Sequence, residues 1–160
     1  MYVDMKLFCH TKRVMKFFGP VWLLLLLGAC SHPDIRDTSG QGYRFDELRG
    51  KTVVINYWAV WCAPCIKEIP ELAALDNNHH DIEVFGVNYD MPEPETMAKQ
   101  IEDLNITFPV LDQDPHARFG IEKPVVLPTT LIINPSGELE ISLIGPQTEA
   151  SLLKVIRDRG

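Results

Sequence analysis

Two cysteines, Cys62 and Cys65, stand two residues apart in the sequence WCAPC over residues 61–65. They follow a short apolar run, residues 53–59, which is rich in β-branched and aromatic side chains and predicts a buried strand. The segment after them, residues 65–75, carries its apolar side chains at helical spacing and predicts a helix. We therefore expect the pair where a strand ends and a helix begins.

The start of a helix is a useful place for such a pair. Unpaired backbone N–H groups and a partial positive charge gather there, and both favour a thiolate over a thiol at Cys62. The thiolate is the form that attacks disulfides. Cys65, one turn further on, can close a small ring with Cys62, and Pro64 stiffens that ring. The spacing predicts a pair that alternates between dithiol and disulfide.

Two other uses of the cysteines compete with this interpretation. They could form half of a zinc site, but zinc prefers four ligands, no second cysteine pair follows, and His79 and His80 are expected at the far end of the helix. They could form a purely structural disulfide, but so short a loop would add little stability. We expect neither a metal ion nor another bound cofactor.

The N-terminus has the pattern of an export signal. Basic residues precede an apolar run, residues 17–27, that is too short to span a membrane comfortably. The next residues, Leu27 to Cys30, resemble the bacterial lipobox, in which a leucine and two small residues precede a cysteine. The resemblance implies that Cys30 is lipid-modified, and it leaves ordinary cleavage or an uncleaved anchor as alternatives. Ser31 in place of Asp favours the outer membrane in a Gram-negative cell.

These features predict three parts: a lipoprotein signal peptide over residues 1–29, a tether over 30–41 and one domain over 42–160. The tether is predicted because the segment is rich in Ser, Asp, Pro and Gly. Once the signal is removed and Cys30 is acylated, Cys62 and Cys65 are the remaining cysteines in an oxidising compartment. The formal charge of −7 argues against a nucleic-acid partner.

The rest of the chain supplies the elements that must position the pair. A second strand is predicted after the first helix, and strand–helix–strand in this order implies a right-handed crossover with parallel strands. Downstream we expect a helix over residues 95–104, a helical turn over 114–119 and an antiparallel hairpin over 127–144. A last helix is expected from Leu152, Leu153 and Ile156, with a cap near Thr148. Asn56, among apolar neighbours in the first strand, is expected to bond to nearby backbone.

This order resembles the thioredoxin-like plan, a three-layer α/β/α fold with a central mixed sheet, arranged as βαβ, an inserted helix and ββα. The motifs are closer to the TlpA/ResA-type membrane-tethered thiol–disulfide oxidoreductases. Two blocks carry the resemblance: KTVVINYWAVWCAPCIKEIPEL over residues 51–72 and LPTTLIINPSG over residues 127–137. The helix at 95–104 stands where that family carries an insertion.

The resemblance implies roles for individual residues. Cys62 matches the nucleophile, and Cys65 matches the buried cysteine that resolves the mixed disulfide. Pro128 matches a cis-proline beside the cysteines, which would hold the backbone of Leu127 and Thr129 as an edge for an extended substrate.

Two further positions bear on proton transfer and on partners. Glu68 matches the family's active-site glutamate, and a partly buried carboxylate there would accept the proton of Cys65. Asn56 stands where thioredoxins proper carry a buried Asp, which leaves proton handling to Glu68. Trp61 is expected to pack against the site and to offer partners an apolar contact, with a purely structural role as the alternative.

The predicted activity is thiol–disulfide exchange outside the cytoplasm, in the reducing direction. Implied partners are client proteins with disulfides, a membrane thiol donor of the DsbD/CcdA type, and the membrane itself, through lipid on Cys30 at the periplasmic face. Apocytochrome c is one candidate client, although PTT at 128–130 replaces the PET usual in the cytochrome c maturation branch. Two alternatives stay open: an oxidant that forms disulfides, and a non-enzymatic binding or chaperone lipoprotein.

Overall fold

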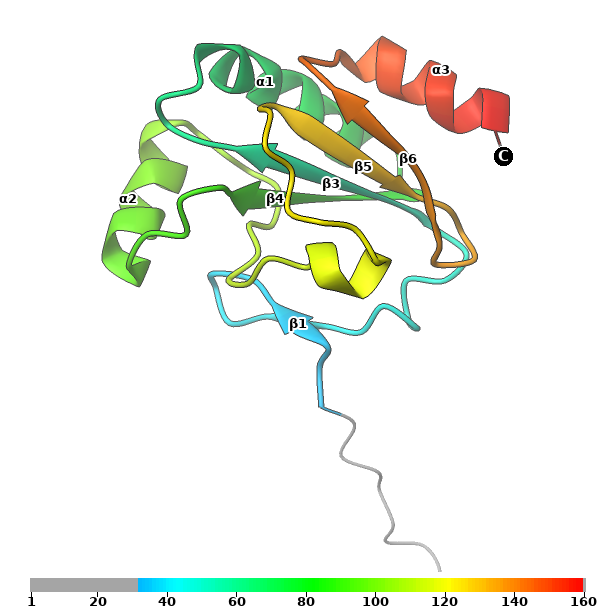
Figure 1. The fold of residues 1–160 in the computed structure, drawn as a ribbon, viewed down its shortest axis with the longest axis horizontal. Helices are drawn as coiled ribbons and strands as arrows, with labels where there is room; N and C mark the ends of the chain where they lie inside the picture. Colours follow the sequence, from blue (N-terminus) through cyan, green and yellow to red (C-terminus); the bar gives the residue numbers. More distant parts are fainter. Residues whose placement is uncertain (1–31, 160) are drawn as a thin grey trace, which may run out of the picture. The chain divides into compact units, whose positions relative to one another are not determined.

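The computed structural model describes residues 32–159, and a four-stranded sheet forms their centre (Figure 1). Its strands lie in the order β4-β3-β5-β6. They comprise β3 (Thr52–Trp58), β4 (Ile82–Asn88), β5 (Thr129–Ile133) and β6 (Leu139–Ile144). Strand β4 pairs parallel with β3, while β5 is antiparallel to both β3 and β6. The sheet is therefore mixed, and the predicted parallel crossover and antiparallel hairpin are confirmed.

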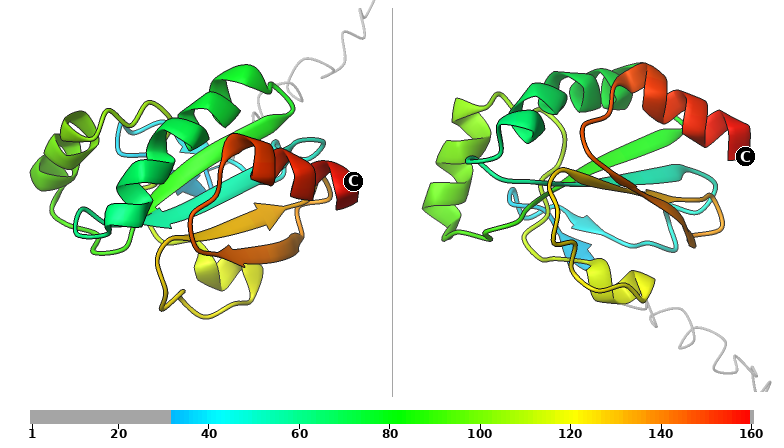
Figure 2. Two further views of the ribbon diagram at one scale, coloured as in Figure 1. Left: turned by 90° about the horizontal axis from the view of Figure 1, so that it is seen from above. Right: turned by 45° about the horizontal axis from the view of Figure 1, so that its top comes forward.

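Different elements cover the two faces of this sheet. Helices α1 (Ala63–Asn78) and α3 (Glu149–Arg159) lie across one face (Figures 1 and 2). Helix α2 (Pro94–Asp103) is tied to the end of β4 by a 2.7 Å hydrogen bond from Asn88 Nδ2 to Gln100 Oε1. The opposite face carries the short 3₁₀ helix η1 (His116–Phe119) and the two-stranded hairpin of β1 (Ile35–Arg36) and β2 (Gly42–Tyr43). The predicted thioredoxin-like α/β fold is confirmed.

Strand β3 is buried along its whole length and contributes to both halves of the core. Because successive side chains of a strand point to opposite faces, Val54 and Trp58 join the cluster beneath α1 and α3, whereas Ile55 and Tyr57 join the cluster on the other face. The same alternation directs Asn56 toward the helices. A polar side chain is thus placed in the layer between the sheet and α1.

The local signals in the sequence also act as predicted. Gly120, with φ +68°, ends η1 in the left-handed conformation that glycine adopts readily. Thr148 Oγ1 accepts the N–H of Ser151 at the start of α3, and Ser151 Oγ accepts the N–H of Thr148 in return. This reciprocal pair is a capping box, so the predicted cap of the last helix is confirmed.

The segment before the sheet differs from the expected tether. Residues 34–43 form a hairpin in which Asp37 is buried and accepts four hydrogen bonds, from the backbone and hydroxyl of Ser39, the backbone of Gln41 and the hydroxyl of Tyr43. Its composition suggested flexibility because Ser, Asp and Gly are frequent in linkers. The same residues also build tight turns around one carboxylate, which is their use here.

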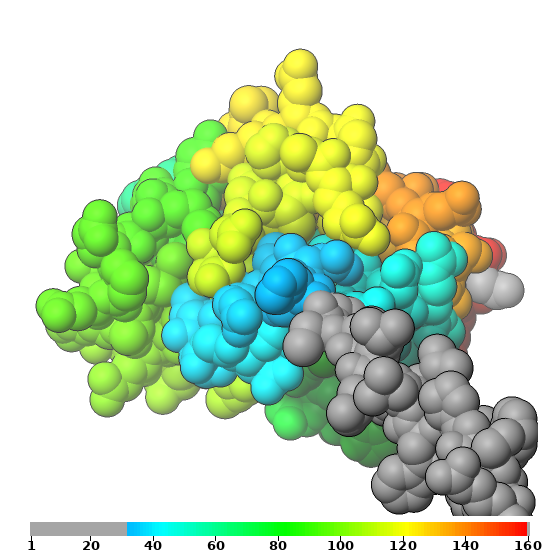
Figure 3. All heavy atoms as spheres, turned by 90° about the horizontal axis from the view of Figure 1, so that it is seen from below, coloured from blue at the N-terminus to red at the C-terminus, as the bar shows by residue number. Residues whose placement is uncertain are grey.

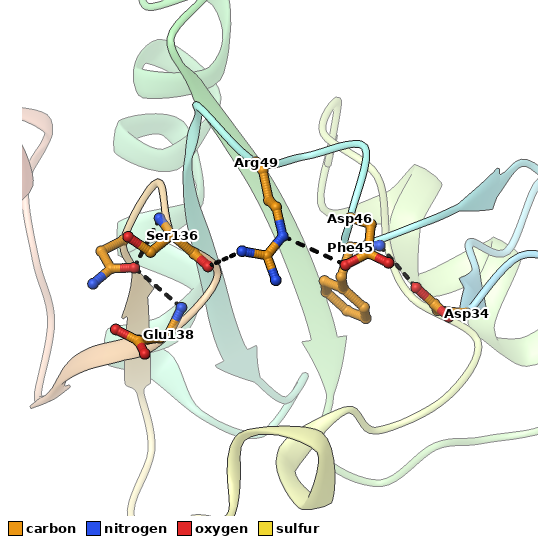
Figure 4. A network of polar contacts seen from close by, with 7 residues as sticks. Asp34, Phe45, Asp46, Arg49, Ser136 and Glu138 are labelled. Atoms are coloured by element: carbon orange, nitrogen blue, oxygen red, sulfur yellow. Dashed lines mark hydrogen bonds and ion pairs between the residues drawn. The ribbon is translucent and has the colours of Figure 1, made fainter.

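The chain after the hairpin is fastened at two places. Phe45 packs edge-on against Phe119 with 5.6 Å between ring centroids, beside the loop of η1 that Figure 3 shows from below. At the end of the sheet remote from the cysteines, Arg49 Nη1 donates to the carbonyl of Ser136 at 2.8 Å (Figure 4). These two contacts hold the segment before β3 against the domain. Within the segment itself, the N–H of Phe45 donates to Asp34 at 2.9 Å.

Residues 1–31, which include the predicted signal peptide and Cys30, lie outside the described residues. Among residues 32–159, no helix is both long enough and apolar enough to cross a membrane.

Candidate active site

Cys62 and Cys65 lie where β3 gives way to α1, as predicted, and their sulfurs form a disulfide. Cys62 is the N-cap residue of α1, and its Sγ accepts the backbone N–H of Cys65 at 3.3 Å. An N–H at the positive end of a helix stabilises negative charge on the sulfur that it meets. The geometry therefore favours Cys62 as the thiolate when the pair is reduced.

The Leu127–Pro128 peptide bond is cis, as predicted. Thr129, which follows it, pairs with Tyr57 near the end of β3 from which the chain runs on to Cys62. The proline thus lies at the same end of the sheet as the cysteines. Thr129 Oγ1 donates back to the carbonyl of Val126 at 2.7 Å and fixes the turn around the cis bond.

Glu68 lies one helical turn after Cys65 and is more deeply buried than predicted, with 1% of its surface exposed. Its Oε1 accepts the backbone N–H of Gln147 at 3.2 Å and the hydroxyl of Thr130 at 3.4 Å. Burial raises the pKa of Glu68 to about 7, against the opposing effect of these hydrogen bonds. A carboxyl group that titrates near neutrality suits the transfer of a proton.

Asn56 is linked to the Glu68 carboxyl group through the hydroxyl of Thr130. It does not bond to nearby backbone, so that prediction is wrong. Its Nδ2 donates instead to Thr130 Oγ1 at 3.0 Å, because Asn56 and Thr130 are directly opposite each other in the β3–β5 register. Two buried oxygens near this chain of bonds, Asn56 Oδ1 and Glu68 Oε2, have no hydrogen-bond partner in the described structure.

Trp61 stands at the surface beside the cysteines. It is 62% exposed, its Nε1 donates to Asp90 at 2.8 Å, and its ring meets the ring of Tyr89 edge-on at 6.3 Å between centroids. Tyr89 is held in turn by Lys123, whose Nζ lies 4.0 Å from the centroid of the Tyr89 ring and 2.8 Å from the Tyr89 carbonyl oxygen. The indole is thus held in place while most of its surface stays exposed to solvent.

Several large apolar side chains near the site are also exposed, and we call them the apolar rim: Val60, Trp61, Val125, Val126 and Ile144. Two of them precede Cys62, two precede the Leu127–Pro128 bond, and Ile144 is paired with Thr129. A shallow hollow of about 200 Å³ opens among Val125, Val126, Thr129 and Ile144. Exposed apolar groups gathered at one place are typical of a surface that binds a partner.

The sequence did not identify Thr130, Asp90 or most of the apolar rim. Thr130 could have been found as a hydroxyl among buried strand residues, but its partner depends on strand register, which the sequence does not state. Within residues 32–159, no cluster of three or more His, Cys, Asp and Glu side chains is arranged to hold a metal ion.

Comparison with known proteins agrees with this geometry. Residues 30–142 match the AhpC/TSA family. The thiol-disulfide oxidoreductase ResA of Geobacillus thermodenitrificans is 30% identical over 124 residues, which are 74% of this chain and 68% of that protein. Two solved structures share the fold. A thioredoxin-family thiol:disulfide interchange protein from Chlorobium tepidum has a TM-score of 0.65 at 21% identity and covers 81% of this chain and 98% of its own.

The second is the exposed lipoprotein thioredoxin of Streptococcus pneumoniae, with a TM-score of 0.64 at 20% identity over 80% of this chain and 99% of its own. At such identities the structures bear on the fold, whereas the family match and the ResA relative bear on the chemistry. The chain therefore belongs to the AhpC/TSA family and is a ResA-like thiol–disulfide oxidoreductase whose active site is the Cys62–Cys65 pair.

Proposed function

We propose that the protein reduces disulfides in client proteins outside the cytoplasm. The observation that carries this is the position of Cys62 at the N-cap of α1, with the N–H of Cys65 directed at its sulfur and the buried Glu68 one turn further on. One cysteine is thereby set up as a nucleophile, and the other has a proton acceptor nearby.

The reaction would proceed in two exchanges. The Cys62 thiolate attacks a client disulfide, so that one client sulfur leaves as a thiolate and the other is bound to Cys62. The Cys65 thiol then gives its proton to the Glu68 carboxylate and attacks Cys62 Sγ. This forms the Cys62–Cys65 disulfide and releases the second client thiolate. Two electrons pass from the pair to the client, and a membrane thiol donor of the DsbD/CcdA type would restore the dithiol.

The client would dock across the apolar rim, with its disulfide beside Cys62. Trp61 would offer an apolar face on one side, and the backbone of Leu127 and Thr129, around the cis bond of Pro128, would offer a short edge on the other. A main-chain edge beside apolar side chains suits an extended and partly unfolded polypeptide. Clients would therefore be proteins whose disulfides are accessible before folding is complete, apocytochrome c among them.

Trapping tests the mechanism directly. In the Cys65→Ser variant the mixed disulfide on Cys62 is not resolved, so covalent complexes with clients should accumulate in the native envelope and dissociate when dithiothreitol is added. Cys62→Ser, which removes the nucleophile, is the matched control and should trap nothing. If Cys65→Ser traps no more than this control, the protein does not act on clients through Cys62.

The direction of exchange is decided by the reduction potential of the pair. A value near that of thioredoxin, about −270 mV, supports reduction, while a value near that of DsbA, about −120 mV, would show an oxidant. Equilibration with glutathione buffers measures it. Absence of insulin reduction by the wild type, with no trapped clients, would favour a non-enzymatic binding lipoprotein.

Anchoring at Cys30 is a separate part of the proposal and is supported by the lipobox-like residues 27–30. Metabolic labelling with a fatty acid should mark the wild type and not Cys30→Ser, and membrane fractionation would then locate the protein on the inner or the outer membrane. If the wild type were not labelled, the proposal that Cys30 is acylated would be wrong, but the proposed redox chemistry would still stand.

A further inference from the structure

We propose that Asn56 and Thr130 are positioning residues for Glu68, and that they form a hydrogen-bond relay which orients its carboxylate and stabilises the charged form. The inference rests on the proposed role of Glu68 as proton acceptor and extends it to two strands of the sheet. Three elements meet at this point: β3 supplies Asn56, β5 supplies Thr130, and α1 supplies Glu68.

The direction of the relay follows from its donors. A threonine hydroxyl has one hydrogen, and an amide nitrogen donates without accepting. Asn56 Nδ2 donates to Thr130 Oγ1 at 3.0 Å, so the hydroxyl hydrogen is left to point at Glu68 Oε1, 3.4 Å away. Both hydrogen bonds of this relay therefore run toward the carboxylate, which is the arrangement that supports a negative charge.

The unpaired oxygens show why the site also accommodates the protonated acid. Asn56 Oδ1 and Glu68 Oε2 are buried and have no hydrogen-bond partner within residues 32–159, and both are acceptors while Glu68 is ionised. An unpaired buried acceptor costs free energy. When Glu68 is protonated, its carboxyl group becomes a hydrogen-bond donor beside these two unpaired acceptor oxygens. Each charge state of Glu68 thus has its own support, which a group that gains and loses a proton in every cycle requires.

Among residues 32–159, no charged side chain shifts the pKa of Glu68. From the loop before α3, Glu68 receives the N–H of Gln147, and on its own helix the neighbouring cysteine is held in the disulfide. Glu71, the next acid on α1, accepts the N–H of Glu149 at 2.9 Å instead. Burial raises the pKa of Glu68, and the hydrogen-bonding groups of Gln147, Asn56 and Thr130 oppose this rise, Asn56 acting on the carboxyl group itself as well as through Thr130.

In the second exchange of the catalytic cycle, the proton leaves Cys65 Sγ and arrives on the Glu68 carboxylate as the new S–S bond forms. The relay neither donates nor keeps a proton in this step. It sets the affinity of Glu68 for the proton that Cys65 releases.

Infrared titration of the oxidised protein tests the relay without any client. In this state neither cysteine titrates, and the carbonyl stretch of a protonated buried carboxyl group, assigned by its loss in Glu68→Gln, reports Glu68 alone. The wild-type midpoint should lie near pH 7. Thr130→Val removes the hydroxyl at nearly constant volume and should raise the midpoint by about half to one pH unit, since a hydrogen bond to a charged group is lost.

Three further variants complete the test. Thr130→Ser keeps a hydroxyl and should keep the wild-type midpoint. Asn56→Leu removes the first donor of the relay and should also raise it. Thr52→Val loses a buried threonine hydroxyl at the far end of β3 and should change nothing.

Wild-type midpoints in both Thr130→Val and Asn56→Leu would overturn the relay, as would an equal rise in Thr130→Ser. Should Thr130→Val fail to fold, as judged by circular dichroism, Asn56→Leu and Thr130→Ser still decide. The proposed function is tested independently, because its failure would appear in client trapping and would leave this titration unaffected.

Discussion

Asn56 and Tyr57, adjacent residues of β3, belong to two buried polar networks on opposite faces of the sheet. The two networks differ in whether the charge of a titratable group can change near neutral pH. On the face of η1, the hydroxyl of Tyr57 donates to Asp114 at 2.7 Å. Burial, together with this bond and the charge of Asp114, raises the pKa of Tyr57 far above its ordinary range, so it stays neutral. On the face of α1, Asn56 leads through Thr130 to Glu68, whose pKa of about 7 allows the charge to change.

The difference shows that burial of polar groups does not by itself make a functional site. Both networks contain a carboxyl group and a partner from β3. In the network beside the cysteines, burial raises the pKa of the acid, Glu68, to about 7. The following predictions test this contrast between a structural face and a chemical face.

The largest effect should come from the nucleophile. Cys62→Ser should reduce insulin reduction to the rate of dithiothreitol alone, because a serine hydroxyl does not exchange with disulfides. Tyr57→Phe, on the structural face, should retain the activity of the wild type. Comparable losses in the two variants would show that the faces are not functionally distinct.

Glu68→Gln should slow the second exchange by roughly a hundredfold, which is at the low end for the loss of a general base. In the wild type this step should accelerate as the pH rises through about 7, because only the ionised carboxylate accepts a proton. Release of client thiol in single-turnover experiments measures it. An unchanged pH profile in the variant would exclude Glu68 as the proton acceptor.

The same substitution should stabilise the fold at alkaline pH. The pKa of Glu68 is raised from 4.5 to about 7 on folding, so the folded state holds its proton more tightly and loses stability as the pH rises through this interval. Glu68→Gln should therefore raise the free energy of unfolding at pH 8 by up to roughly 3 kcal/mol, with little difference near pH 4.5. Urea denaturation of the oxidised proteins at the two pH values measures both; a gain independent of pH would contradict this origin.

Tyr57→Phe should lower the free energy of unfolding by about 1 to 2 kcal/mol, because the half-buried Asp114 carboxylate loses a hydrogen bond. Thermal or urea unfolding of the two proteins measures this change in the free energy of unfolding. The infrared midpoint of Glu68 should not move. A shift of that midpoint would mean that the two networks communicate across the sheet.

The smallest effect is expected at the apolar rim. Val125→Ser should lower kcat/KM for a protein disulfide by about fivefold, since part of a valine side chain is no longer buried against the client. Reduction of a small disulfide that does not reach the rim should be unaffected. Ala150→Ser, an exposed position on α3, is the control. Equal losses for large and small substrates would place Val125 outside the docking surface.

The sequence predicted those parts of the molecule that depend on local pattern. The strand at 82–88, the turn that ends at Gly120 and the position of Cys62 at a helix start follow from periodicity and from turn residues, and all are confirmed. Parts that depend on register were not predicted. Asn56 and Thr130 are 74 residues apart, and only their exact pairing across β3 and β5 makes them partners.

The hairpin around Asp37 escaped prediction for a different reason. Its residues suit a linker and a tight turn equally well, and the choice is made by tertiary contacts. The N–H of Thr38 donates to the carbonyl of Val110, and Asp37 forms a β-bridge with Leu111, both far away along the chain. The composition of the segment does not indicate either of these contacts.

Strand β6 forms one margin of the sheet, and its pairing with β5 is interrupted by a register shift at Ile132 and Ile133. A regular edge strand can pair with a strand of a second chain. Irregular pairing and charged side chains at the edge disfavour such strand addition. Glu140 lies at the register shift itself, and Glu138 stands just before the strand. Strand β6 is therefore poorly suited to pair with a strand of another chain, and the irregular pairing disfavours aggregation through this edge of the sheet.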